Sequence, residues 1–316
     1  VEEVARKYEK IVTDTNELRE FLLREVTAIT ETGVTIFSDE TRNNEWWDEL
    51  KKSHDFLPQY WTRYYSYLNN KPFWSLKSIQ DLDTSTDKIM NVLADPTTHK
   101  ACKRRGLAFG YVQCGKTAHY IGLINKAYDA GYKFIIVLSG IHNSLRSQTQ
   151  ARIDEEVLGY ESSPYISGTY KKEKNVIGVG LGEGNAIENM QELQSLTTRD
   201  EKGDFNKKKA GTSVLPPFVI ITKKHSTILK YIIDYFINSP KAEAGGPEGK
   251  YFSSDYPALI IDDEADQASI NTNAFVDKKS GAEIDPTTIN QRIRQLINIF
   301  ECCSYIGYTA TPYANI

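Results

Sequence analysis

From about residue 104 onward, short apolar runs alternate with longer segments in which apolar residues recur every three or four positions. The runs are GLAFGYV, KFIIVLSG, NVIGVG, PFVIITK, PALIIDDE and CSYIGYTAT, and helical periodicity covers 117–130, 144–158, 226–237 and 287–300. Buried strands that alternate with helices are typical of a mostly parallel sheet covered on both faces. The pattern therefore predicts an α/β fold whose ligand lies at the carboxyl ends of the strands.

The first hundred residues have a different pattern and are predicted to be helical. Apolar residues between Val4 and Val26 follow helical spacing, and the stretch from Trp46 to Trp74 is dense in aromatic residues. We favour a small helical core that packs on the next domain over a platform for stacking bases, which the spacing does not select. We therefore divide the chain into a helical accessory region, 1–100, and an α/β domain, 101–316.

Two stretches interrupt the alternation. Residues 160–216 are long and polar, and 241–255 read as a flexible connection. The first stretch holds two groups of lysines, Lys171, Lys172 and Lys174, then 207–209. A solvated loop is favoured for these lysines over a patch that binds nucleic acid.

Composition narrows the class of protein. The 316 residues carry a net charge of −4, so the chain has no general basic surface for nucleic acid and any such contact must be local. No apolar run approaches the length of a membrane span, and the first residues lack the apolar centre of a secretory signal. The four cysteines form no CxxC pair, which argues against a zinc site and fits a reducing compartment. We expect a cytoplasmic protein with no membrane association.

The stretch GYVQCGKT has the spacing of a phosphate-binding loop, or Walker A motif. Such a P-loop needs backbone N–H groups that converge on an anion, a lysine that reaches the β- and γ-phosphates, and a hydroxyl group for Mg²⁺. Gly110 and Gly115, Lys116 and Thr117 meet these needs between an apolar strand and an amphipathic helix. The sequence therefore predicts ATP and Mg²⁺ as cofactors. The residues expected to contact the nucleotide are Gly110, Gln113, Cys114, Gly115, Lys116 and Thr117, and Thr117 is also expected at the metal.

A carboxylate at the end of a second core strand should complete a nucleotide site, and ALIIDDEAD supplies it as a Walker B motif. We assign Asp263 to Mg²⁺, usually through water, and Glu264 to activation of the hydrolytic water. The choice between Asp262 and Asp263 stays open, because a slip of one residue moves a side chain to the opposite face of the sheet. Thr309 and Thr311 of GYTATPY follow the last strand and are expected to couple this site to the rest of the protein.

The order GxxxxGKT, DEAD and TAT resembles motifs I, II and III of superfamily 2 helicases and translocases, and 263–266 spells the DEAD box. Over residues 100–316 the chain more narrowly resembles the Z1-domain helicases, a bacterial family whose assignment as endonucleases rests on association. The resemblance implies a P-loop NTPase with a RecA-like lobe. By position it also implies candidate nucleic-acid contacts at motifs Ia and Ib, for which packing or capping is an equal alternative. These candidates are Ser139, Gly140, Arg146, Gln148, Thr222, Lys223 and Lys224.

The resemblance further implies an ATP hydrolase that acts on DNA rather than RNA, in a restriction or phage-defence system. Motifs IV to VI do not occur before Ile316, so we expect a longer protein with a second RecA-like lobe and a downstream domain, and weak or no turnover from this piece alone. A methyltransferase, a nuclease or a MORC-like ATPase is the implied companion. The alternative that the residues leave open is a nucleotide-gated switch, or assembly ATPase, which acts on protein partners without moving a strand.

Overall fold

The architecture comes from a computed structural model, which describes residues 45–109, 115–162, 175–182, 190–206, 217–266, 275–276, 283–284 and 286–309. The helix expected between Val4 and Val26 and both lysine groups of the polar stretch lie outside the described residues. No helix in the described part of the chain is long and apolar enough to cross a membrane.

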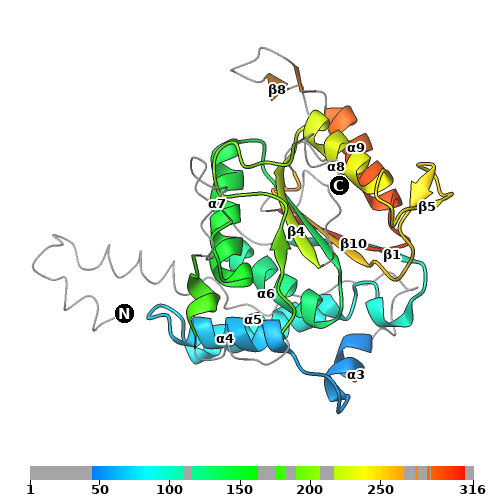
Figure 1. Cartoon of the computed structure of the whole chain (residues 1–316). Helices are drawn as coiled ribbons and strands as arrows, with labels where there is room; N and C mark the ends of the chain where they lie inside the picture. Colours follow the sequence, from blue (N-terminus) through cyan, green and yellow to red (C-terminus); the bar gives the residue numbers. More distant parts are fainter. Residues whose placement is uncertain are drawn as a thin grey trace, which may run out of the picture.

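A six-stranded sheet in the order β1-β10-β7-β2-β4-β3 forms the centre of the molecule (Figure 1), and every neighbouring pair in it is parallel. Its strands are β1 (Cys102–Phe109), β2 (Phe134–Ser139), β3 (Gln194–Ser195), β4 (Phe218–Lys223), β7 (Ala258–Asp263) and β10 (Cys302–Thr309). The register sets Phe109 beside Thr309 and Tyr308 beside Asp263, so three strands end side by side at one edge. The predicted α/β class is confirmed, and the sheet is consistent with a RecA-like lobe.

Helices cover both faces of this sheet because successive strand residues point to opposite sides. In β2, Ile135 and Val137 belong to one buried cluster, and Ile136 belongs to the other. The first cluster includes α4 (Gln59–Asn69), α5 (Leu76–Met90), α6 (Lys116–Asp129) and α7 (Asn143–Ile153), and the second includes α8 (Ser226–Ile237) and α9 (Pro286–Asn298). All four helices expected from residue 117 onward are present, and Gly131 follows the end of α6 with a φ of 101° that favours glycine.

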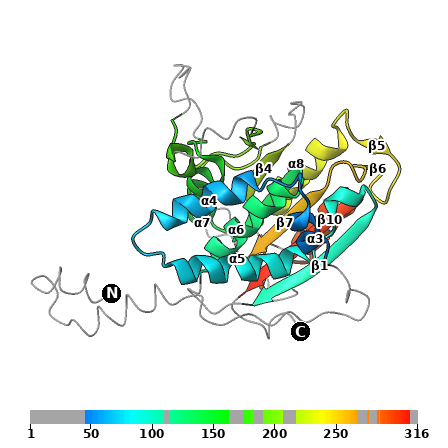
Figure 2. The same ribbon diagram turned by 90° about the horizontal axis from the view of Figure 1, so that it is seen from below.

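Two of the three accessory helices, α4 and α5, pack directly on α6 (Figure 2), and α3 (Trp46–Lys52) packs on α5. A short 3-10 turn, Pro96–Thr98, leads from these helices to β1. Trp47, Trp61 and Tyr64 are buried in the same cluster as the apolar residues of α6. The helical-core interpretation of the aromatic stretch is therefore confirmed for these residues.

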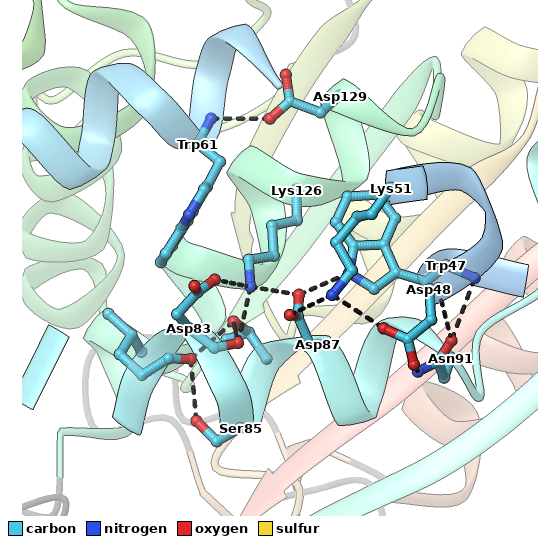
Figure 3. A network of polar contacts seen from close by, with 12 residues as sticks. Trp47, Asp48, Lys51, Trp61, Asp83, Ser85, Asp87, Asn91, Lys126 and Asp129 are labelled. Atoms are coloured by element: carbon cyan, nitrogen blue, oxygen red, sulfur yellow. Dashed lines mark hydrogen bonds and ion pairs between the residues drawn. The ribbon is translucent and has the colours of Figure 1, made fainter. Parts of the chain in front are cut away.

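A buried lysine joins α6 to the accessory helices (Figure 3). The side chain of Lys126 is 1% exposed, and its ammonium group lies 2.5 Å from a carboxylate oxygen of Asp83 and 2.6 Å from one of Asp87. Asp87 also accepts hydrogen bonds from the Trp47 indole N–H at 2.6 Å and from Lys51 at 2.6 Å. The same ammonium lies 4.3 Å from the centroid of the Trp61 ring. This cation of α6 thus contacts α5 and α4 directly, and α3 joins the network through Asp87.

Three segments differ from the sequence-based prediction. The strand expected at NVIGVG is wrong, because Gly178–Leu181 form a 3-10 turn. Gly178 has a φ of 53°, and a Cβ there would lie 1.9 Å from the Glu155 carbonyl oxygen, so the backbone turns where only glycine fits. The polar stretch 160–216 supplies β3. The connection 241–255 is partly ordered as an antiparallel pair, β5 (Glu243–Ala244) and β6 (Lys250–Tyr251).

Two further short elements occur among the described residues. A π-helical turn, Asp154–Leu158, continues α7. A second antiparallel pair, β8 (Phe275–Val276) and β9 (Glu283–Ile284), precedes α9.

Candidate nucleotide site

The expected phosphate-binding loop lies between β1 and α6. Gly115 precedes the first helical residue, Lys116, with φ 72° and ψ 18°, a left-handed conformation that glycine adopts without strain. No side chain of the described residues caps the N-terminus of α6, which leaves its first N–H groups available to an anion. Thr117 lies in the first turn and is half-buried. The other three predicted loop residues, Gly110, Gln113 and Cys114, lie outside the described residues.

The carboxylates at the end of β7 point in different directions. Asp262 is fully buried, where its carboxylate lies 2.6 Å from the Lys224 ammonium and accepts a hydrogen bond from the Tyr305 hydroxyl at 2.7 Å. Asp263 lies toward α6, because the Tyr120 hydroxyl of that helix donates to it at 3.3 Å. Of the two candidates that the sequence left open, Asp263 is therefore the one whose side chain lies on the side of the predicted phosphate loop.

Glu264 brings the two motifs together. The Lys116 ammonium lies 3.6 Å from a carboxylate oxygen of Glu264. The backbone of Glu264 has a φ of 57°, which a residue with a side chain rarely adopts. The strand therefore ends in a strained turn at the residue that the sequence assigns to water activation, a pairing often found at functional sites.

The protonation of Asp263 responds to these neighbours. Burial raises the pKa of Asp263 above its usual value, and the Glu264 carboxylate adds to the rise. The positive charges of Lys116 and Lys224 and the hydrogen bond from Tyr120 act in the opposite direction. A buried carboxylate beside a second one favours a positive charge nearby, which is the electrostatic requirement of a metal ligand.

The turn after β7 is also tied to β10. Thr309 donates from its hydroxyl group to the Asp266 carboxylate at 3.0 Å, and the Ala265 N–H donates to the Tyr308 carbonyl at 2.8 Å. The first contact is a hydrogen bond to an acidic residue of the kind expected for Thr309, and its coupling role stays a prediction. Thr311 lies outside the described residues.

Several residues that sequence reasoning missed surround this turn. The Tyr308 hydroxyl lies 3.0 Å from Nδ1 of His119, and its ring contacts the Tyr120 ring edge-on. Burial lowers the pKa of His119 to about 4, so this histidine is neutral at physiological pH. A Cβ at Gly307 would lie 2.9 Å from the Ala265 side chain, so glycine lets the turn pack against β10. His119 and Tyr120 follow Lys116 closely, and Gly307 and Tyr308 lie inside β10, but no pattern in the sequence singled these residues out.

Three candidate nucleic-acid contacts at motif Ia have structural roles or remain exposed. Arg146 is 0% exposed, and its guanidinium donates to the carbonyls of Thr198 and Asp200. This arrangement favours the packing alternative for Arg146, which fastens the loop after β3 to α7. Ser139 is buried and donates to the Thr222 carbonyl at 3.2 Å, whereas Gln148 is exposed.

The motif Ib candidates divide in the same way. Thr222 and Lys224 are buried, and the Gly140 carbonyl accepts from the Lys224 N–H at 3.0 Å. Lys223 is half-exposed, and its ammonium donates to the Asn143 side chain at 3.0 Å. Lys223 and Gln148 are thus the two charged or amide side chains of the motif candidates that remain accessible in the described part of the chain.

The residues present fit ATP and Mg²⁺. Lys116 and the uncapped start of α6 suit phosphate, and Thr117 and Asp263 are oxygen donors of the kind that Mg²⁺ accepts beside nucleotide phosphates. Among the described residues, no group of three or more His, Cys, Asp and Glu side chains could hold a metal by itself. Neither a scan against protein-family models nor a search of curated proteins finds a match for the chain. A proposal of function therefore rests on the chain's own residues.

Proposed function

We propose that this chain is the ATP-binding lobe of an ATP-dependent DNA helicase or translocase of the superfamily 2 type. One observation carries the proposal: the Lys116 ammonium, at the start of α6, lies 3.6 Å from the Glu264 carboxylate, at the end of β7. A hydrolase needs this convergence, because one group must hold the phosphates while the other orients the water that attacks them.

Each residue has a distinct task in this proposal. Lys116 and the N–H groups of the first turn of α6 hold the β- and γ-phosphates. Thr117 and Asp263 hold Mg²⁺, which supplies charge neutralisation on the phosphates when bound. Glu264 accepts a hydrogen bond from the attacking water and orients it. Lys116 faces Glu264 at 3.6 Å, so a bound phosphate would bring a second anion to the same cation.

The response to hydrolysis would pass through β10. The Ala265 N–H and the Asp266 carboxylate both contact this strand, at Tyr308 and Thr309. A shift of the Glu264 turn would therefore move the start of the segment that follows β10. In the proposal this segment leads to a second RecA-like lobe and a downstream domain, whose closure and opening would move the strand.

The nucleic-acid strand would lie near the carboxyl ends of β2 and β4, where Lys223 ends β4 and Gln148 is exposed on α7, the helix that follows β2. A net charge of −4 agrees with a local contact of this kind rather than a general basic surface. We place the protein in a restriction or phage-defence setting, with a methyltransferase, a nuclease or a MORC-like ATPase as companion, on the strength of the Z1-domain resemblance.

A second candidate is a nucleotide-gated switch that binds protein partners and does not move along nucleic acid. The burial of Arg146 and Lys224 favours it, because two of the basic residues at motif positions are used inside the fold. The two candidates share the nucleotide site and differ in what stimulates it.

Stimulation of ATP turnover in the full-length protein separates them. A translocase is expected to turn over ATP faster with DNA than with RNA or without nucleic acid. The stimulation by DNA should fall as the logarithm of the salt concentration rises. Lys223→Met is expected to reduce the stimulation and leave the basal rate in place. A rate that is indifferent to nucleic acid but rises with a companion protein would favour the switch.

A further inference from the structure

Lys224 occupies an unusual place for a lysine that follows a strand end. Its side chain is 0% exposed, and its ammonium group lies 2.6 Å from a carboxylate oxygen of Asp262, which is also 0% exposed. Buried lysines are rare unless they are paired, because removing an ammonium group from water is costly. The pair must therefore have a local structural use.

The ammonium of Lys224 also reaches the backbone of the water-activating residue. It donates a hydrogen bond to the Glu264 carbonyl oxygen. On the other side of the same peptide unit, the Ala265 N–H donates to the Tyr308 carbonyl at 2.8 Å. Because a peptide unit is planar and rigid, bonds at both its oxygen and its N–H fix its orientation.

This fixation acts on a strained residue. Glu264 holds a φ of 57°, a conformation that costs on the order of 1 kcal/mol or more and persists only where surrounding contacts determine it. The orientation of the peptide after Glu264 and the φ before it together set the direction of the Glu264 side chain. In this conformation, that side chain lies 3.6 Å from the Lys116 ammonium.

Lys224 is itself held in place. The Tyr305 hydroxyl donates to the second oxygen of Asp262 at 2.7 Å, and the Lys224 N–H donates to the Gly140 carbonyl at 3.0 Å. The lysine is thus anchored at both ends, by its backbone to the end of β2 and by its ammonium to β7.

We infer that Lys224 is a positioning residue, which fixes the Glu264–Ala265 peptide so that the Glu264 carboxylate faces the phosphate site. This positioning role replaces the nucleic-acid contact that the motif position implied for Lys224. The inference rests on the proposed function. Asp262 serves as the buried counter-charge that holds the lysine, which explains why two aspartates in a row follow the apolar residues of β7.

A double-mutant cycle tests the inference in the full-length protein. The variants are Lys224→Met and the charge-neutral pair Lys224→Met with Asp262→Asn, which avoids an unpaired buried carboxylate. Each is expected to lower kcat at least about tenfold while KM for ATP changes less than about threefold. In a Glu264→Gln background, the same substitutions should have almost no further effect on the rate of ATP hydrolysis measured by single turnover. The reason is that substitutions of residues that act as a unit do not have additive effects. Lys230→Met, an exposed lysine on α8, is the matched control and should match the wild type in both backgrounds.

The outcomes are distinct. An unchanged kcat, or an equal loss with and without the Glu264 carboxylate, overturns the inference and leaves the nucleotide site in place. If the wild-type protein neither binds nor hydrolyses ATP, the proposed function fails, and hydrogen exchange decides the structural claim. Faster exchange of the Ala265 amide in the charge-neutral pair than in Lys230→Met supports peptide fixation by Lys224, and equal exchange overturns it.

Discussion

The Lys116 ammonium and the Glu264 carboxylate lie 3.6 Å apart, one at the start of α6 and the other in the turn after β7. The sheet order makes this contact possible, because β10 alone separates β1 from β7 and all three strands end at the same edge. A cation and an anion at this distance attract each other. The contact therefore has consequences for both binding and turnover.

Replacement of Glu264 by glutamine should separate binding from hydrolysis. The amide keeps the size of the side chain and loses its ability to accept a proton, so kcat for ATP should fall by about 10²–10⁴-fold. The affinity for Mg-ATP should stay the same or rise, because a negative charge near the phosphates is removed. Equilibrium binding and steady-state turnover measure the two effects, with the exposed Glu201→Gln as control. A variant that turns over ATP at the wild-type rate would refute the role of Glu264.

Gly307 should be intolerant of even a methyl group. A Cβ there would lie 2.9 Å from both the Ala265 side chain and Cδ1 of Leu107, whereas a Cβ at Gly106 would meet nothing within 4 Å. Gly307→Ala is expected to lower the free energy of unfolding by about 1–3 kcal/mol through overpacking. Gly106→Ala, in the neighbouring strand, is the control and should be close to neutral. Denaturant unfolding of the two variants measures the difference, and equal stabilities would contradict the close packing of the Ala265 turn.

Lys126 should contribute more to stability than Lys51, although both contact Asp87 (Figure 3). Lys126→Met leaves two carboxylates without their buried cation, and we expect a loss of about 1–3 kcal/mol, below the value for fully buried pairs because Asp83 and Asp87 are partly exposed. Lys51 is 34% exposed, so Lys51→Met should cost less than about 1 kcal/mol. Thermal or denaturant unfolding ranks the stabilities of the two variants. A larger loss for Lys51→Met than for Lys126→Met would contradict the central place of Lys126 in this ion-pair network.

Asp129 should make stability depend on pH near neutrality. It accepts the N–H groups of Tyr60 at 2.9 Å and Trp61 at 2.8 Å, at the first turn of α4. Burial raises the pKa of Asp129 to about 7 from its usual 3.8, although these N–H groups oppose the rise. A raised pKa means that the folded state holds the proton more tightly, so the contribution of Asp129 is greatest at low pH and is lost as the pH rises from about 4 to about 7.

A comparison of wild type with Asp129→Asn isolates this contribution, because the amide does not titrate. Between pH 5 and pH 8 the wild type should lose about 2 kcal/mol of unfolding free energy relative to the variant. If the unfolding free energies of the two proteins change in parallel with pH, Asp129 stays ionised in the folded state. Its two N–H donors, acting alone, would favour that ionised form.

The sequence predicted the elements with strong periodicity. The apolar runs of β2, β4 and β7 are buried along nearly their whole length, and the helix expected at 226–237 is present as α8 with the same bounds. The run NVIGVG was misleading, because three apolar residues resembled a strand while its two glycines form a turn. A strand requires backbone hydrogen-bond partners on an adjacent strand, and the apolar pattern of one segment does not show whether such a strand exists.

The candidate site was predictable in its motifs and not in its supporting contacts. Lys116 and Glu264 were identified from residue type and position, because the chemistry of phosphate binding restricts both. Lys224 was a candidate nucleic-acid contact with packing or capping as an equal alternative, and the sequence could not decide between them, because its burial depends on the pairing with Asp262 across the end of β2. Tyr308 and Gly307 contribute through contacts between strands that spacing along one strand does not reveal.

Calorimetric titration of Mg-ATP into the 316-residue chain tests the central claim most directly. If Lys116 and the carboxylates of the β7 turn hold one nucleotide, the wild type and Lys230→Met should bind a single Mg-ATP, and Lys116→Met and Asp263→Asn should each weaken binding by about tenfold or more. Absence of binding to the wild type at millimolar Mg-ATP, or equal binding by all four proteins, would contradict the account.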